Sequence, residues 1–163
     1  MIENEVKYVL SLDSNIEDNI KKSIIKQGYD KNGARVRDQN GICTFNYKMK
    51  NGDFIEEFEM QITREEFERC YEFCSNNLEK TRYTIKDEYS NTWDIDFFNS
   101  NDEIYFVMAE CEMIDPHKEY PDKLIPFVEK NCIYQVPRAD SRKFSSRKLS
   151  DVGYAKKILE ELK

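Results

Sequence analysis

The sequence lacks the residues from which several common kinds of site are built. Its 163 residues include five cysteines with no Cys-x-x-Cys pair, and a single histidine. An odd number of scattered cysteines does not suit a disulfide framework, and the shortage of histidine and of paired cysteines does not suit a zinc site. We therefore expect a reducing, cytoplasmic setting.

Long apolar runs and an excess of positive charge are also missing. No apolar run approaches the roughly 18 residues that a membrane-spanning helix needs, and the N-terminus has no apolar signal core. The formal net charge of −7 argues against sequence-independent binding to nucleic acid, which requires a basic surface. We expect neither a membrane nor nucleic acid as a partner, and the sequence leaves the oligomeric state open.

What the chain does contain indicates one folded domain over residues 1–163. Hydrophobic residues make up 39% of the sequence, charged residues 35% and aromatic residues 13%. This is too much Phe and Tyr for a disordered chain, and the length suffices for one substantial core. No linker, low-complexity stretch or internal repeat divides the sequence.

Capping signatures and apolar spacing predict three helices. Ser14 and Glu17 have the spacing of a capping box, with isoleucines following at helical intervals, and Thr63 and Glu66 repeat the signature before a second helix that ends near Asn76. A third helix fits residues 150–163, and two prolines frame a turn or short helical piece at 121–126.

Alternating segments bounded by turn residues predict at least seven antiparallel strands. They comprise the opening run and residues 34–38, 42–50, 54–62, 80–86, 92–98 and 105–113. Asn40-Gly41 and Asn51-Gly52 lie between such runs, as hairpin turns do. A sheet with so many local hairpins is not a parallel α/β design, so we expect an α+β fold.

Each predicted strand carries one charged and one largely apolar face, because successive side chains of a strand point to opposite sides. The charges are grouped by sign, with acidic pairs on four strands and basic pairs on at least two others. The charged set comprises Glu3, Glu5, Lys7, Arg35, Arg37, Asn46, Lys48, Lys50, Glu57, Glu59, Gln61, Lys80, Arg82, Asp94, Asp96, Glu110 and Glu112.

Two structures account for these charged faces. In the first, a half-buried sheet turns them to solvent. In the second, a closed barrel of about eight strands turns them inward and the helices pack on the outside. Like charges facing each other across a sheet are unfavourable unless opposite charge lies between them. Hard divalent cations between the carboxylates and a polyphosphate between the Lys and Arg groups would supply that charge.

The order of the motifs resembles that of the CYTH domain, also called the triphosphate tunnel metalloenzymes. Glu3-Asn4-Glu5-Val6-Lys7 resembles the Glu-x-Glu-x-Lys opening of that family, Ile25-Lys26-Gln27-Gly28-Tyr29 its glutamine-glycine-tyrosine strand, and Arg35-Val36-Arg37 its Arg-x-Arg motif. Later segments also resemble family strands, at residues 45–48, 57–62, 78–83, 93–98 and 109–112. The resemblance covers residues 1 to about 150. Phe144 and Ser146 depart from it, standing where family members have a Tyr-x-Asn-type segment.

The resemblance implies an eight-stranded antiparallel barrel that forms a tunnel, with helices outside, and that binds a triphosphate with Mg²⁺ or Mn²⁺. The implied metal ligands are Glu3, Glu5, Asp96, Glu110 and Glu112. The implied phosphate-binding residues are Lys7, Arg35, Arg37, Lys48, Lys80, Arg82 and Arg147. The implied catalytic residues are Tyr29 as a proton acceptor with a pKa lowered by nearby cations, and Glu57 and Glu59, which would orient the cations or the attacking water.

Alternatives stay open for two of these assignments. Tyr29 also suits a packing role beside Gly28, and the basic segment 138–148 also suits a solvated loop. For the whole protein, the resemblance implies a metal-dependent hydrolase of inorganic triphosphate or a related organic triphosphate. An adenylate cyclase of the same family and a non-catalytic binder of nucleotides or polyphosphate are the alternatives.

Overall fold

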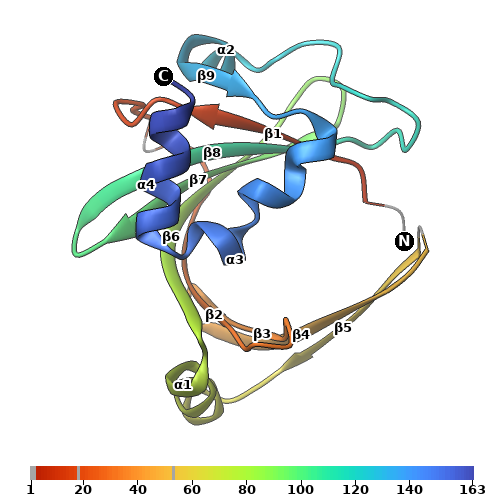
Figure 1. The fold of residues 1–163 in the computed structure, drawn as a ribbon. Coiled ribbons are helices and arrows are strands. Elements are labelled where there is room, and N and C mark those ends of the chain that lie inside the picture. The colour runs from red at the N-terminus through yellow and green to blue at the C-terminus, as the bar shows by residue number, and fades with distance from the viewer. Residues whose placement is uncertain (1–2, 18, 53) are drawn as a thin grey trace.

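The described residues form one antiparallel sheet of nine strands, which Figure 1 shows strongly curved around a concave side. The computed structural model describes residues 3–17, 19–52 and 54–163. The strands follow the order β5-β4-β3-β2-β6-β7-β8-β1-β9. Their bounds are β1 Glu5–Leu10, β2 Lys22–Tyr29, β3 Arg35–Gln39, β4 Ile42–Asn51, β5 Phe54–Gln61, β6 Asn76–Lys86, β7 Thr92–Ser100, β8 Glu103–Glu112 and β9 Cys132–Gln135.

The predicted closed barrel of eight strands is wrong, because the sheet has nine strands and stays open. Strand β9 pairs with the free edge of β1, with Tyr8 opposite Gln135. That edge would have to pair with β5 to close a barrel. In the part of the chain that the structure describes, β5 and β9 remain the two ends of the sheet. A salt bridge of 2.9 Å between Glu3, just before β1, and Lys48 on β4 spans the open side.

Helices lie on both faces of the sheet, and not only on the outside as predicted. Their bounds are α1 Arg64–Phe73, α2 Pro126–Asn131, the 3₁₀ helix η1 Arg138–Phe144, α3 Ser146–Leu149 and α4 Val152–Glu161. On the convex face, Phe67 of α1 packs on Val36 and Cys43, and Val128 of α2 joins the cluster around Trp93. The C-terminal helices η1, α3 and α4 cover part of the concave face (Figure 1).

The concave face is apolar under the C-terminal helices and charged beyond them. Val9, Leu78 and Phe98 pack against side chains of η1, α3 and α4. Each of these residues lies two positions along its strand from a charged residue, so apolar and charged side chains share one face. The apolar cluster therefore fixes the C-terminal helices beside the charged part of the concave face.

Two of the predicted helices are confirmed. Helix α1 begins with the predicted capping box, in which Thr63 Oγ1 accepts from the Glu66 amide at 3.1 Å and Glu66 Oε1 accepts from the Thr63 amide at 2.9 Å. Helix α4 lies within residues 150–163, and Asp151 is its N-cap. The predicted proline-framed piece precedes α2, which begins at Pro126.

The helix predicted from Ser14 is wrong. Residues 14–17 are irregular, and the Ser14 hydroxyl donates to the Ser11 carbonyl at 2.6 Å instead of capping a helix. The chain then enters β2, which pairs with β3 on one edge and β6 on the other and buries Ile25 completely. Two ladders of backbone hydrogen bonds and a buried side chain outweigh a local helix signal here.

The seven predicted strands are confirmed as β1 and β3–β8, and the alternating pattern missed β2 and β9. Hairpin turns set the register of several pairs. Asn40 and Gly41 have φ values of 52° and 89°, and Asn101 and Asp102 have values of 51° and 63°. Two successive positive φ angles are typical of the tight turns that match strand twist. No helix among the described residues is long and apolar enough to span a membrane.

Candidate active site

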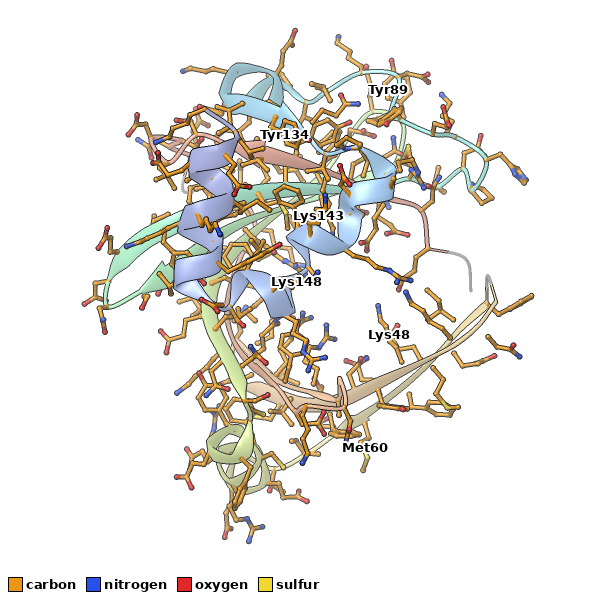
Figure 2. All side chains as sticks on the ribbon, viewed as in Figure 1. Lys48, Met60, Tyr89, Tyr134, Lys143 and Lys148 are labelled. Atoms are coloured by element: carbon orange, nitrogen blue, oxygen red, sulfur yellow. The ribbon has the colours of Figure 1, made fainter. Side chains whose placement is uncertain are left out.

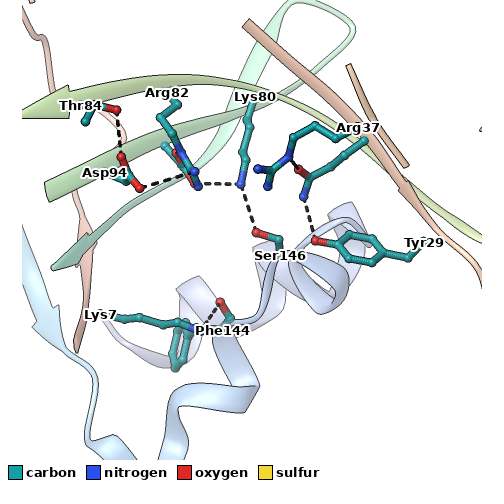
Figure 3. Close-up of polar contacts among 11 residues, drawn as sticks. Lys7, Tyr29, Arg37, Lys80, Arg82, Thr84, Asp94, Phe144 and Ser146 are labelled. Atoms are coloured by element: carbon teal, nitrogen blue, oxygen red, sulfur yellow. Dashed lines mark hydrogen bonds and ion pairs between the residues drawn. The ribbon is translucent and has the colours of Figure 1, made fainter. Parts of the chain in front are cut away.

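A cluster of cations lies on the concave face where β6, β2 and β3 meet (Figure 3). Lys80 of β6 is 1% exposed, and its ammonium lies 2.9 Å from Asp96 Oδ2 on β7. Burial lowers the pKa of Lys80 to about 8, although the Asp96 charge opposes that shift. The side chain is thus still mainly protonated at neutral pH and is held deep in the fold.

Asp96 is the buried counter-ion of two cations. Burial disfavours its ionised form, but the charges of Lys80 and Arg82 outweigh that effect and hold the pKa of Asp96 well below its ordinary value. Arg82 binds it through two hydrogen bonds, from Nε at 2.7 Å and Nη2 at 2.8 Å. Arg82 also lies 3.5 Å from Asp94, whose carboxylate accepts from the Thr84 hydroxyl. Asp96, expected to bind metal, is therefore engaged by cations.

The arginines of β3, Arg35 and Arg37, bring further positive charge, which the Asp96 carboxylate does not neutralise. Burial lowers the pKa of Arg37 to about 10, and repulsion from Arg35 and Arg82 adds to the shift. The Nε atom of Arg35 is buried without a hydrogen-bond partner in the described part of the protein. A buried donor without a partner is costly, and an anion reaching this cluster would satisfy it.

Gln27, which the sequence interpretation did not assign to the site, connects Arg37 to Tyr29. Arg37 Nε donates to Gln27 Oε1 at 2.9 Å, and Gln27 Nε2 donates to the Tyr29 hydroxyl oxygen at 2.8 Å (Figure 3). Gln27 is fully buried. Because the tyrosine oxygen accepts from Gln27, its own O–H is free to donate elsewhere. The two-residue spacing of Gln27 and Tyr29 on one strand was the signal that placed both on this face.

Gly28 lies between these two residues on the opposite face of β2. A Cβ atom there would come within 2.8 Å of the Cys74 sulfur, just after α1, and within 2.9 Å of Asn77 Oδ1. Both distances are too short for a real Cβ contact, so glycine allows this part of the chain to lie close against β2.

Lys7 and Lys48 approach the concave side from opposite parts of the sheet. The Lys7 ammonium is buried against η1 and donates to the carbonyls of Ser141 at 3.0 Å and Phe144 at 3.4 Å. Lys48 projects into the concave side from β4 in Figure 2 and pairs with Glu3. Lys80 also donates to the Ser146 hydroxyl at 3.2 Å. Of the two residues that depart from the family pattern, Ser146 thus supplies a side-chain oxygen to Lys80, whereas Phe144 supplies to Lys7 a backbone carbonyl that any residue would offer.

A group of carboxylates lies next to the cations, on β1 and β8. Glu5 lies directly opposite Glu112, and Glu110 lies opposite Lys7 on one side and Asp94 on the other. Burial raises the pKa of Glu5 to about 7, and the Glu112 charge and a hydrogen bond with that carboxyl add to the shift. Burial, then repulsion from Glu5 and Asp96, raises the pKa of Glu110 to about 7. These acids repel one another and lack enough nearby positive charge.

The acids on β1 and β8 fit a hard divalent cation by the chemistry of their donor atoms. Carboxylate oxygens are the ligands that Mg²⁺ and Mn²⁺ prefer. Among the residues that the structure describes, no three His, Cys, Asp or Glu side chains are already arranged as metal ligands. Glu3 is paired with Lys48, so its carboxylate would have to exchange this partner to join Glu5, Glu110 and Glu112 around an ion.

The remaining predicted residues lie further from these two groups. Glu57 on β5 lies opposite Lys48 and accepts a hydrogen bond from the buried Asn46. Glu59 is exposed on the same edge strand. Arg147 donates to the Lys31 carbonyl at 3.2 Å in the β2–β3 turn, and its guanidinium is directed to that turn instead of the cation cluster.

Asn4 is a second residue that the sequence interpretation did not assign. It is buried between Glu3 and Glu5 and donates to the carbonyls of Asp115 at 2.9 Å and Lys118 at 2.8 Å. Its oxygen accepts from Arg138 Nη2 at 2.6 Å. These three bonds fix the backbone that carries the two glutamates, and strand alternation turns the glutamates to the concave side.

Comparison with known proteins shows the fold. No family model matches the chain, and no curated protein does. The inorganic triphosphatase NE1496 superposes with a TM-score of 0.63 at 19% identity, over 92% of this chain and 95% of that one. A candidate adenylate cyclase, bh2851 from Bacillus halodurans, gives 0.60 at 17% identity, over 88% and 98%.

HpAC1 from Hippeastrum, a candidate adenylyl cyclase with a dominant triphosphatase activity, gives a TM-score of 0.50 at 15% identity, over 71% of this chain and 81% of that one. At such identities these likenesses are evidence of a shared fold. The three solved structures agree with the resemblance in the motif order, and the chain has the fold that these proteins share.

Proposed function

We propose that the protein is a divalent-metal-dependent hydrolase that removes the terminal phosphate of inorganic triphosphate or of a related organic triphosphate. One observation carries this proposal. A group of cations that repel one another lies beside a group of carboxylates that repel one another, on the same concave face. A triphosphate is long and negative enough to contact several cations, and a divalent ion between it and the carboxylates would relieve the second group.

The cations have distinct parts in binding. Lys80 and Arg82 are held in place by Asp96, so their geometry is set before a substrate arrives. Arg35 offers a buried donor that its described neighbours do not satisfy, and Arg37 is oriented by Gln27. A preorganised set of donors stabilises charge that develops as the phosphoanhydride bond breaks. Lys7 and Lys48 lie on β1 and β4 and would bind phosphates at the edges of this cluster.

The acids and Tyr29 would prepare the attacking water. Glu5, Glu110 and Glu112, with Glu3 once it leaves Lys48, would hold Mg²⁺ or Mn²⁺. When bound, the ion would neutralise phosphate oxygens and polarise the water. Tyr29, held by Gln27, presents an O–H to the concave side. Glu57 and Glu59 on the edge strand remain candidates for orienting Lys48 or the water.

The structural neighbours favour hydrolysis over cyclisation. NE1496 is an inorganic triphosphatase, and HpAC1 combines a candidate cyclase identity with a dominant triphosphatase activity. The alternative, an adenylate cyclase, would use the same cations and carboxylates, with the ribose hydroxyl of ATP as the nucleophile. A binder that only sequesters polyphosphate would gain little from a group of partly buried carboxylates that repel the ligand.

A substrate panel tests the proposal. The purified protein, with Mg²⁺ or Mn²⁺ and with a chelator as control, is given tripolyphosphate, thiamine triphosphate and nucleoside triphosphates, and orthophosphate is measured. Cyclic AMP with pyrophosphate from ATP would indicate the cyclase. Tight calorimetric binding with all ligand recovered unchanged would indicate the binder, and no product from any substrate contradicts hydrolysis.

Matched variants separate the site from general damage to the protein. Lys80→Ala should lower kcat by roughly 10²- to 10³-fold, the range for removing a preorganised charge stabiliser. Lys86→Ala, at the exposed end of the same strand, is its control. Glu110→Gln should be similarly inactive, and Glu103→Gln at the exposed start of β8 is its control. Full activity in Lys80→Ala and Glu110→Gln would contradict the site assignment.

A further inference from the structure

The convex face of the β4–β5 hairpin is exposed and mainly apolar, with one acidic residue, Glu56, opposite Met49. Tyr47 lies directly opposite Phe58, and Met49 and Met60 continue the same face by strand alternation. Phe54 begins β5 on this face. Figure 2 shows Met60 and Lys48 on opposite sides of the hairpin, with Lys48 toward the concave side. The hairpin therefore presents charges to the candidate active site, and to solvent it presents large apolar side chains together with Glu56.

A small pocket extends this apolar surface toward α1. Phe73, the last residue of α1, is largely exposed and lines a pocket of about 200 Å³ with Val36 and Phe45. Phe45 lies opposite Met60, so the pocket adjoins the hairpin. Because an apolar cavity of about 150 Å³ holds a benzene molecule, this pocket can hold one aromatic ring.

The surface is large for an exposed apolar patch. We define the apolar hairpin face as Tyr47, Met49, Phe54, Phe58, Met60 and Phe73. Their exposed fractions range from 37% to 87%. At about 200 Å² for each fully accessible large side chain, the exposed part amounts to roughly 700 Å². The largest patch on a typical monomer is about 300–600 Å², and a stable interface buries about 800 Å² on each partner.

We propose that the apolar hairpin face is the interface of a homodimer. A two-fold contact needs one patch that complements itself. This face offers both parts, namely protruding aromatic side chains such as Phe58 and a pocket of the size of one ring. Its methionines can adapt their shape to facing aromatic rings, which makes the contact between two copies favourable.

The copies would meet face to face, and not by joining their edge strands. A two-fold antiparallel pairing of β5 centred on Phe58 would set Glu57 of one copy opposite Glu59 of the other. Like charges directly opposite each other disfavour such pairing, and acidic residues are a common protection of edge strands. Face-to-face contact leaves both glutamates on the concave side of their own subunits.

Sedimentation velocity or light scattering tests the proposal across roughly 1 to 100 μM, a range that brackets ordinary dimer affinities. The wild-type protein should have a mass near twice the 19.5 kDa of the chain. The variant Phe58→Glu with Met60→Glu should be monomeric, with a dissociation constant raised at least ~100-fold, since each dimer would bury four unpaired charges. The control is Ile114→Glu, which changes an exposed apolar residue beyond the end of β8 and should stay dimeric.

Two results would overturn the homodimer. One is a wild-type mass of a single chain at every concentration, even if another protein binds the face. The other is a double variant that remains dimeric. Circular dichroism checks that the variants fold, and Met60→Lys alone serves as a milder replacement if the double variant does not. The test needs no enzymatic activity, so it is independent of the proposed function.

Discussion

Replacing Asp96 with asparagine tests whether this carboxylate is a buried counter-ion. Asp96 is fully buried and contacts Lys80 and Arg82 at 2.9 Å or less. Removing one partner of a buried ion pair costs about 3–5 kcal/mol, because the remaining charge is left without compensation. For a chain of this size, such a loss corresponds to a melting temperature lower by roughly 6–20 °C.

Asp94→Asn is the matched control. Asp94 lies 3.5 Å from Arg82 and is 28% exposed, so its loss should cost less than about 1 kcal/mol. Urea unfolding followed by circular dichroism gives both free energies. Tripolyphosphate without metal should raise the melting temperature of Asp96→Asn more than that of the wild type, since a bound anion replaces part of the missing charge. Equal stabilities of the two variants would refute the counter-ion role.

Three further predictions concern the carboxylates, the glutamine and the glycine. The pKa values of Glu5 and Glu110 are raised to about 7. The contribution of these two carboxyl groups to the stability of the fold is therefore fully present below pH 4.5, their ordinary pKa, and is lost as the pH rises through 7. Thermal melts of the metal-free protein should show a loss of about 5 kcal/mol between pH 5 and 8, roughly half of it from each group, and excess Mg²⁺ should flatten this dependence; a stability that rises over the interval contradicts the prediction. Gln27→Leu should weaken calorimetric tripolyphosphate binding roughly tenfold by releasing Arg37, and Gln27→Glu should weaken it as well, because a carboxylate beside Arg37 neutralises a charge that the ligand would contact; equal affinities of Gln27→Leu and the wild type argue against this. Gly28→Ala should destabilise the protein by about 1–3 kcal/mol in urea unfolding, because its Cβ would lie 2.8 Å from a neighbouring sulfur atom; an unchanged midpoint is the contrary result.

The sequence was enough to predict the strands that carry the site, with the exception of β2. Alternation at a period of two placed Glu5 and Lys7 on one face, and the same reasoning placed Lys80 and Arg82 together. That pattern survives in the structure because one face of these strands packs on a core and a one-residue shift would invert it. Period and spacing, however, do not say which charges of opposite sign face each other across neighbouring strands. The register of Arg82 with Asp96 gave that carboxylate a different partner from the one expected.

Features that depend on distant segments could not be predicted from local patterns. β9 is a run of four residues, too short for an alternating pattern, yet its pairing with β1 is what keeps the sheet open. The helices after residue 138 have ordinary apolar spacing, which does not state which face of a sheet they cover. The segment after Ser14 carried a genuine capping pattern, but β6, one of the two strands that pair with β2, is far away in sequence.

The salt bridge between Glu3 and Lys48 has a consequence for how two ligands would bind. In the proposed roles, Glu3 belongs to the metal site and Lys48 to the phosphate site. In the unliganded protein the two side chains are paired with each other instead. Whichever ligand arrives first must break the pair, and it thereby frees a group for the second. Metal and triphosphate would then bind with positive cooperativity, and the enhancement would be the same in either order because linkage is reciprocal.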